Sequence, residues 1–214
     1  MAVSATREEV DIRAKHVHDL MRRDADALMG RLEITAAEAG WTVHRAKSKE
    51  QAAEYIRDVV QDLKATSVVR SAHDALDNLD LETKFDLIGV QSQLIAKGYG
   101  LDSDALRQKV IKADLGITGV DYAIVETGSC VIIPRQGVSR IVSLVPPVHI
   151  AVVRKGQVLA DLDQLFTLCR DDFLDANLGS YMNIISGPSR SADIEYTLIT
   201  GVHGPEEVHM VLLD

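Results

Sequence analysis

The sequence predicts an α/β fold, with a mostly parallel sheet, helices on both of its faces and some antiparallel strands. Segments with helical periodicity alternate with short apolar segments at both ends of the chain. In the middle, pairs of apolar segments flank Thr127-Gly128 and Pro146-Pro147, as strands flank a turn in a hairpin. No internal repeat or linker-like segment interrupts the chain. We therefore expect one α/β domain, 41–214, preceded by an N-terminal helical arm, 1–40.

The arm is predicted from an apolar stripe whose members recur at steps of three, four or seven residues, as on one face of a long helix. Two interpretations stay open. The stripe packs on the core of its own chain, or it grips a second subunit and makes a homo-oligomer. The stripe consists of Val10, Ala14, Val17, Met21, Leu28 and Leu32.

The other elements follow from the same patterns. Ser48 and Gln51 form a capping box at the start of an amphipathic helix. The helices that we expect are 48–63, 103–112 and 161–173, and the strands are 41–44, 67–70, 85–90, 122–126, 129–133, 141–145, 148–153, 182–185 and 208–213.

Composition limits the classes of function. The chain has 214 residues, 46% of them apolar and 26% charged, which is the balance of a soluble globular protein. Its net charge of −9 argues against nucleic acid or anionic lipid as a partner. No apolar run approaches the roughly 20 residues of a membrane span. Because the N-terminus also lacks the apolar region of a signal peptide, we expect a cytoplasmic protein.

Metals and cofactors are not expected in this chain. Cys130 and Cys169 are 39 positions apart in apolar surroundings, so we predict two buried, unreactive thiols. Two cysteines cannot supply the thiolates of an iron–sulfur cluster. His203 and His209 do not match the spacing of a zinc-binding helix, and His149 is expected to be a hydrogen-bonded core histidine. No dinucleotide, P-loop or α/β-hydrolase signature occurs.

A candidate anion site lies in the segment IISGPSRSADIE, 184–195, together with GVHGP, 201–205. An apolar run stops at a Gly-Pro pair and gives way to hydroxyls and a guanidinium, at what the pattern indicates is the entry to a short helix. Backbone N–H groups in such a place bind anions. The alternative is a tight turn with its arginine on the surface. The candidate ligand-binding residues here are Gly187, Ser189, Arg190, Ser191, Asp193 and His203.

Four further candidates precede this segment, and two of them, Thr127 and Gly128 in the hairpin turn, are expected to bind the ligand. Glu126 ends an apolar strand before Thr127-Gly128, where a desolvated carboxylate could serve as base, acid or nucleophile, or else hydrogen-bond a turn N–H. Arg140 borders a predicted strand, where it could bind a carboxylate or phosphate in a bidentate way, or be an ordinary surface arginine. We expect the bends near 127, 188 and 203 to surround one shared cleft.

At four motifs the sequence resembles the LUD-domain family, in particular its lactate utilisation protein C branch. The motifs are DYAIVETGS (121–129), SRIVSLVPPVHIAVV (139–153), IISGPSRSADIE (184–195) and GVHGPEEVHMVLL (201–213).

The resemblance implies a fold like that of sugar-phosphate isomerases, glucosamine-phosphate deaminases and CoA transferases. It also implies a role in bacterial oxidation of L-lactate to pyruvate, beside partner proteins that carry iron–sulfur clusters. Because the chain shows no cluster or nucleotide motif, we expect an accessory subunit with a small-anion pocket. The alternative is a stand-alone enzyme or sensor for a small carboxylate, phosphate ester or CoA-type ligand.

Overall fold

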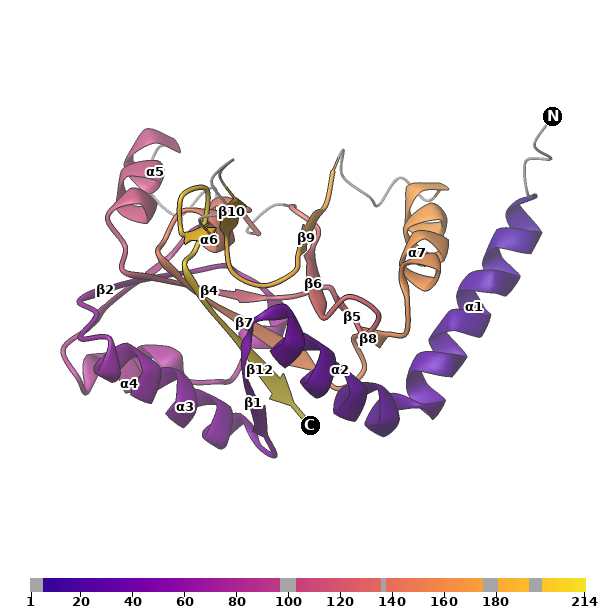
Figure 1. Ribbon diagram of the computed structural model, residues 1–214, viewed down its shortest axis with the longest axis horizontal. Helices are drawn as coiled ribbons and strands as arrows, with labels where there is room; N and C mark the ends of the chain where they lie inside the picture. The colour runs from indigo at the N-terminus through magenta and orange to yellow at the C-terminus, as the bar shows by residue number, and fades with distance from the viewer. Residues whose placement is uncertain (1–5, 97–102, 136–137, 175–180, 193–197) are drawn as a thin grey trace.

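The computed structural model describes residues 6–96, 103–135, 138–174, 181–192 and 198–214 (Figure 1). The helices in these parts of the chain are α1 (Arg7–Arg23), α2 (Ala25–Ala39), α3 (Lys49–Asp62), the 3-10 helix η1 (Asp74–Leu76), α4 (Leu81–Asp86), α5 (Ser103–Ile111), α6 (Ile141–Leu144) and α7 (Leu162–Leu174). The strands are β1 (Thr42–Ala46), β2 (Ser67–Arg70), β3 (Gln91–Leu94), β4 (Leu115–Gly119), β5 (Tyr122–Ile124), β6 (Ser129–Ile132), β7 (Val148–Arg154), β8 (Val158–Leu159), β9 (Asn183–Ile185), β10 (Arg190–Ala192), β11 (Leu198–Thr200) and β12 (Glu207–Leu213).

The main sheet confirms the predicted α/β class. Its six strands run in the order β1-β12-β7-β4-β2-β3, and every neighbouring pair is parallel. The central strands β7 and β4 are apolar and buried nearly throughout, as expected where both faces of a parallel sheet are covered. Of the predicted hairpin pairs, 122–126 and 129–133 form the antiparallel strands β5 and β6 of a second sheet, ordered β8-β5-β6-β9. The predicted pair 141–145 and 148–153 does not form, because 141–145 is helical and β7 is parallel to both of its neighbours. A further antiparallel pair, β10-β11, was not predicted.

Successive layers of helices and sheets build the core (Figure 1). Helices α3 and α4 cover one face of the main sheet, with Ile56 and Phe85 packed on strand residues such as Ile150. Helix α2 and the second sheet cover the other face. Helices α1 and α7 pack together on the outer face of the second sheet.

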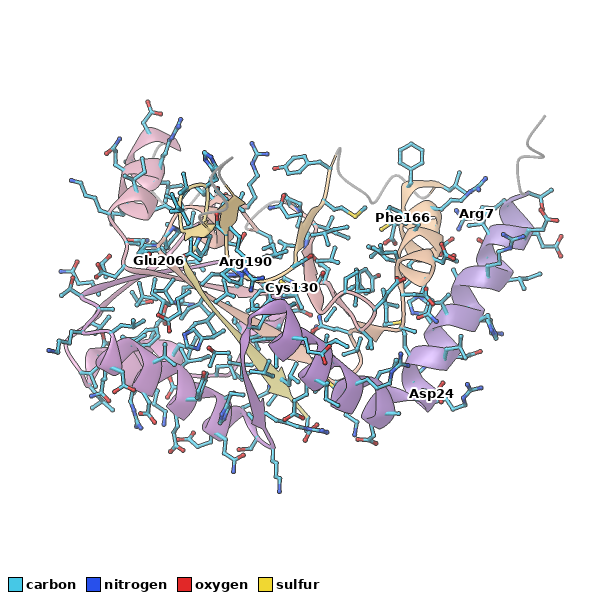
Figure 2. The ribbon with its side chains drawn as sticks, in the orientation of Figure 1. Arg7, Asp24, Cys130, Phe166, Arg190 and Glu206 are labelled. Carbon is cyan, nitrogen blue, oxygen red and sulfur yellow. The ribbon has the colours of Figure 1, made fainter. Side chains whose placement is uncertain are left out.

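The N-terminal stripe forms two helices, so the expectation of one long helix was wrong. Asp24 leaves the helical conformation and starts α2, and the chain changes direction there (Figure 2). Both halves of the stripe are buried on their own chain: Met21 lies against the second sheet, and Leu32 against the main sheet as well. The observed packing therefore follows the first interpretation. The boundary between an arm, 1–40, and a domain, 41–214, stays a prediction.

Three predicted elements differ in the structure. Segment 85–90 is not a strand, because α4 runs to Asp86 and Gly89, at a φ of 71°, turns the chain so that the Val90 N–H bonds to the Phe85 carbonyl. Segment 141–145 is helix α6, whose backbone at Val142 packs directly over Gly116 of β4. The segment after Ser189 is strand β10 rather than a helix, because it pairs with β11.

One central strand was missed altogether. Strand β4 has the sequence LGITG, whose two glycines weaken the strand pattern. Within the described residues, no helix is long and apolar enough to cross a membrane.

Candidate functional site

The predicted bend at Thr127-Gly128 is packed against the backbone of helix α2. Gly128 has a φ of 59°, and a Cβ atom there would overlap the Thr35 carbonyl. The next residue links this bend to the second one, because Ser129 Oγ lies 2.7 Å from Thr127 Oγ1 and 2.6 Å from Ser186 Oγ. The hairpin turn and the turn before Pro188 are therefore joined by a chain of hydroxyl groups.

The second and third bends lie together at the end of the same helix. Gly187, at a φ of 95°, packs against the Ala39 carbonyl. Ser189 N–H donates to the Pro205 carbonyl at 2.8 Å, and Ser189 Oγ accepts from His203 N–H at 3.3 Å. These loops lie where strands β7 and β12 begin, at the amino edge of the main sheet (Figure 1).

The charged side chains predicted for this site are engaged locally. Arg190 lies over the end of α2 (Figure 2) and donates from Nη2 to the Ala39 carbonyl at 3.1 Å. The exposed carboxylate of Glu126 accepts from the Leu162 N–H at the start of α7, at 3.2 Å. Exposed Arg140 stacks over the ring of Tyr181, 4.9 Å from its centre.

The surroundings of Arg190 do not favour an anion, because a helix C-terminus carries partial negative charge. The half-buried Ser191 lies in β10, and Asp193 lies outside the described residues. Anion binding by this set of residues stays a prediction.

A different polar pocket, of about 270 Å³, lies at the carboxyl edge of the main sheet. His73 follows β2, Asp121 follows β4, Arg154 ends β7, and Arg135 follows β6 of the second sheet. In open α/β sheets, ligands bind in the crevice outside the carboxyl ends of the strands. This pocket therefore has the usual position of a ligand site in this class of fold.

Asp121 lies beside Ile133, Arg135 and His73. Its Oδ2 accepts from the Ile133 N–H at 2.6 Å, and its Oδ1 lies 2.7 Å from Arg135 Nη1. The carboxyl is largely buried, which alone would raise its pKa. The adjacent His73 imidazole, the hydrogen bond from the Ile133 N–H and the charge of Arg135 outweigh burial and hold the pKa of Asp121 below its ordinary value. Asp121 is therefore a fixed negative charge.

His73 lies behind Asp121 and is almost fully buried. Its Nδ1 accepts from the Ala75 N–H at 3.1 Å and lies 3.0 Å from Asp74 Oδ1, so a protonated ring would donate to Asp74 instead. Its Nε2 lies 3.5 Å from Asp121 Oδ1, longer than an ordinary hydrogen bond, and has no other partner within the described residues. With Nδ1 accepting from Ala75, the ring proton lies on Nε2, on the side of Asp121.

Two details fix this arrangement. A Cβ atom on Gly119 would overlap the His73 ring, so the glycine at the end of β4 makes room for the imidazole. Arg154 Nη2 donates to Asp74 Oδ2 at 2.9 Å, which ties the last residue of β7 to helix η1. Burial opposes ionisation of Asp74, but Arg154 outweighs it and lowers the pKa of that carboxyl. The pocket thus contains two arginine–aspartate pairs around one imidazole.

The sequence analysis missed these residues for a definable reason. Asp121 is within the motif DYAIVETGS, but the strand before it was not recognised, so its place at a carboxyl end was hidden. The signal for His73 was present: SAHDAL directly follows the predicted strand 67–70. Arg154 directly follows the predicted strand 148–153 in the same way.

The parallel six-stranded sheet, the smaller mixed sheet and the polar pocket at the carboxyl edge define an α/β protein with a small-molecule-sized site. The model of the LUD domain matches residues 29–213, and the chain belongs to the LUD-domain family.

Similar proteins carry lactate utilisation names. Lactate utilization protein C of an Exiguobacterium species is 44% identical over 114 residues, 51% of this chain and 48% of the relative. The protein C of Halalkalibacterium halodurans is 36% identical, covering 67% of this chain and 69% of the relative. Lactate utilization protein B of Bacillus subtilis is 23% identical, covering 94% of this chain and 50% of the relative. The chain thus spans about half the length of two of these three relatives.

A solved structure shares the fold. The crystal structure of a DUF162 family protein from Deinococcus radiodurans superposes with a TM-score of 0.61 at 18% identity, covering 89% of this chain and 98% of that one.

Proposed function

We propose that the chain is an accessory subunit of a bacterial system that oxidises L-lactate to pyruvate, and that it contributes a pocket for a small anion. The observation that carries this proposal is its similarity, at 36% and 44% identity, to two proteins named lactate utilization protein C. In this proposal the electrons leave through partner subunits that carry iron–sulfur clusters.

The longer relatives support a role beside a partner. Lactate utilization protein B of B. subtilis and the uncharacterized electron transport protein YkgF of Escherichia coli match 94% and 97% of this chain, but only 50% and 52% of their own lengths. A unit like this chain therefore recurs in proteins that have about as much additional sequence. Such sequence can supply redox groups that an accessory subunit lacks.

A deletion and reconstitution experiment tests the accessory role. Removing the gene should abolish growth on L-lactate as the carbon source and leave growth on glucose unchanged, and a plasmid copy should restore it. The purified chain should not oxidise L-lactate with an artificial electron acceptor. It should increase the activity of the partner subunits when it is added back. Undiminished growth of the deletion strain on L-lactate would reject the proposal.

The alternative, a stand-alone enzyme or sensor, is favoured by one specific observation. The imidazole of His73 lies between the carboxylates of Asp74 and Asp121, and an imidazole held by carboxylates is an arrangement that general acid–base catalysis uses. Oxidation of L-lactate by the purified chain, with an artificial electron acceptor and no partner subunit, would establish this alternative. Loss of that activity in His73→Gln, with folding retained, would then assign the proton transfer.

A further inference from the structure

We propose that two copies of this chain associate through the outer faces of their α7 helices, which pack antiparallel across a two-fold axis. This inference goes beyond the proposed function, whose partners are subunits of other kinds. The surface also differs from the apolar stripe of the N-terminal helices, because that stripe is buried within its own chain.

The outer face of α7 carries two exposed aromatic side chains. The inner face packs Leu165 and Leu168 on the second sheet. On the opposite side of the helix, Phe166 is 54% exposed and Phe173 is 67% exposed. Residues seven positions apart lie on the same side of a helix, so the two rings belong to one face. Large apolar side chains gathered on one exposed face indicate a surface for association.

A groove of about 400 Å³ lies beside Phe166, between α7 and α1. It is lined by the nearly buried Val10, with Arg13 and Thr167 also bordering it. The groove is large enough for an aromatic ring, so Phe166 of a second copy has a place to enter. Helices α1 and α7 lie together at one end of the molecule, away from the main sheet (Figure 1).

The charges on this face match those of a second copy. Asp163 and Arg170 are exposed, and neither side chain forms an ion pair or hydrogen bond within the described part of the chain. If the two-fold axis passes between Phe166 and Thr167, position 163 of each antiparallel helix lies opposite position 170 of the other. The axis then creates two Asp163–Arg170 pairs at once, and Phe166 of each copy meets Thr167 of the other. The face is therefore complementary to itself.

Other occupants fit this face less well. An anionic membrane surface would repel Asp163 and a chain with a net charge of −9. A strongly acidic protein would pair with Arg170 but bring carboxylates against Asp163. The net charge also opposes association of two copies at long range. At physiological ionic strength, however, charges more than about 8 Å apart are largely screened, so the contacts across the axis decide the outcome.

Analytical ultracentrifugation of the purified full chain at about 0.15 M salt, from about 1 µM to about 500 µM, tests the inference. The native chain should change from monomer to dimer as its concentration rises. Arg170→Asp and Asp163→Arg should each weaken association at least about tenfold, because each places two like-charge pairs across the axis. An equimolar mixture of these two variants should associate again. In the mixed dimer one copy has two cations and the other has two anions at these positions.

Two further variants separate this face from a general effect of charge. Phe166→Ser leaves the charges unchanged and should also weaken association, because it removes the aromatic side chain at the centre of the interface. The matched control is Arg107→Asp, the same reversal of charge on the exposed side of α5, toward the opposite end of the molecule (Figure 1). This control should associate as the native chain does. Circular dichroism should confirm that each variant is folded.

Three results would overturn the inference. They are a native chain that stays monomeric up to about 500 µM, single variants that associate as tightly as the native chain, and a mixture of the two charge variants that stays monomeric. Failure here is distinct from failure of the proposed function, because growth of the deletion strain on L-lactate does not depend on which surface joins two copies.

Discussion

The guanidinium of Arg190 donates a hydrogen bond to the carbonyl oxygen of Ala39, the last residue of helix α2, at 3.1 Å. Next to this contact Gly40 adopts a φ of 101° and ends the helix, and there is no room for a Cβ atom between it and Arg190. The arginine that is most conspicuous in the sequence thus serves to end a helix and to hold the loop after Gly187 against it. Cations at a helix C-terminus interact favourably with its dipole.

Removing this contact should lower stability modestly. Arg190→Gln should reduce the free energy of unfolding by about 0.5–1.5 kcal/mol, because it removes a charge-assisted bond to an exposed helix end. Urea denaturation followed by circular dichroism measures this change. Arg57→Gln, in an exposed pair with the adjacent Asp58, is the control and should change stability less. Equal effects of the two variants would argue that the contact with Ala39 contributes nothing.

The glycines against helix α2 should tolerate no side chain. At both Gly128 and Gly187 a Cβ atom would overlap backbone carbonyls of α2, at Thr35 and Ala39, and φ is positive. Backbone cannot move aside as a flexible side chain can, so Gly128→Ala and Gly187→Ala should each lower the free energy of unfolding by more than about 2 kcal/mol.

Gly156→Ala is the matched control, because nothing lies within 4 Å of its added Cβ. Thermal unfolding of the three variants compares them directly. Wild-type stability in Gly128→Ala would show that α2 can shift away from the hairpin turn.

The success of the sequence analysis depended on whether a local pattern alone decides the structure. Strand β7 was located to within one residue because its apolar run is interrupted only by His149 and is buried on both faces. Segment 141–145 has a similar apolar run, but Gly116 opens space above the sheet and the segment packs there as helix α6. The burial and hydrogen bonding of His149 were predicted, since a lone histidine in such a strand needs a partner. The pocket at the carboxyl edge was not predicted. Its residues come from four separate strand ends, which only the order of the strands in the sheets brings together.

The carboxylate of Asp121 should stabilise the fold in a pH-dependent way. Its pKa in the folded protein lies below the ordinary value of 3.8, so its contribution is present above that pH and is lost as the pH falls through the folded value. At about neutral pH, Asp121→Asn should cost about 1–3 kcal/mol, because Ile133 N–H and Arg135 lose their charged acceptor. The difference between native chain and variant should narrow below about pH 4.

Urea denaturation at a series of pH values measures that difference. Asp19→Asn, at an exposed carboxylate on α1, should show almost no effect at any pH. If the difference in free energy of unfolding between the native chain and Asp121→Asn stayed constant down to the acid transition, the pKa of Asp121 would not be lowered in the folded protein.

Both thiols should be unreactive while the protein is folded. Burial raises the pKa of Cys130 far above its ordinary value, and burial together with nearby carboxylates raises the pKa of Cys169 to about 11. The thiolate is the reactive form, so at about pH 8 a disulfide reagent should label neither cysteine on the timescale of mixing. Concentrated guanidinium chloride should release both of the chain's thiols at once. Rapid labelling of one thiol in the folded protein would show an opening near α7 or the second sheet.

The buried His149 should make the protein less stable as the pH falls below neutrality. Its Nε2 lies 2.8 Å from Thr118 Oγ1, while its Nδ1 has no partner within the described residues. Burial, with a smaller effect of His209, lowers the pKa of His149 from 6.5 to about 3. Between these two values the unfolded chain binds a proton that the folded chain does not, so stability falls as the pH falls, by up to about 1.4 kcal/mol per pH unit.

His149→Gln keeps a polar atom near Thr118 and cannot take up a proton. The free energy of unfolding of this variant should therefore depend less steeply on pH between about pH 6 and pH 4. Some dependence should persist, because burial also lowers the pKa of His209. His16→Gln, on the exposed side of α1, should leave the slope unchanged. If the slope of His149→Gln equals that of the native chain, the imidazole is already protonated or is hydrated in the folded state.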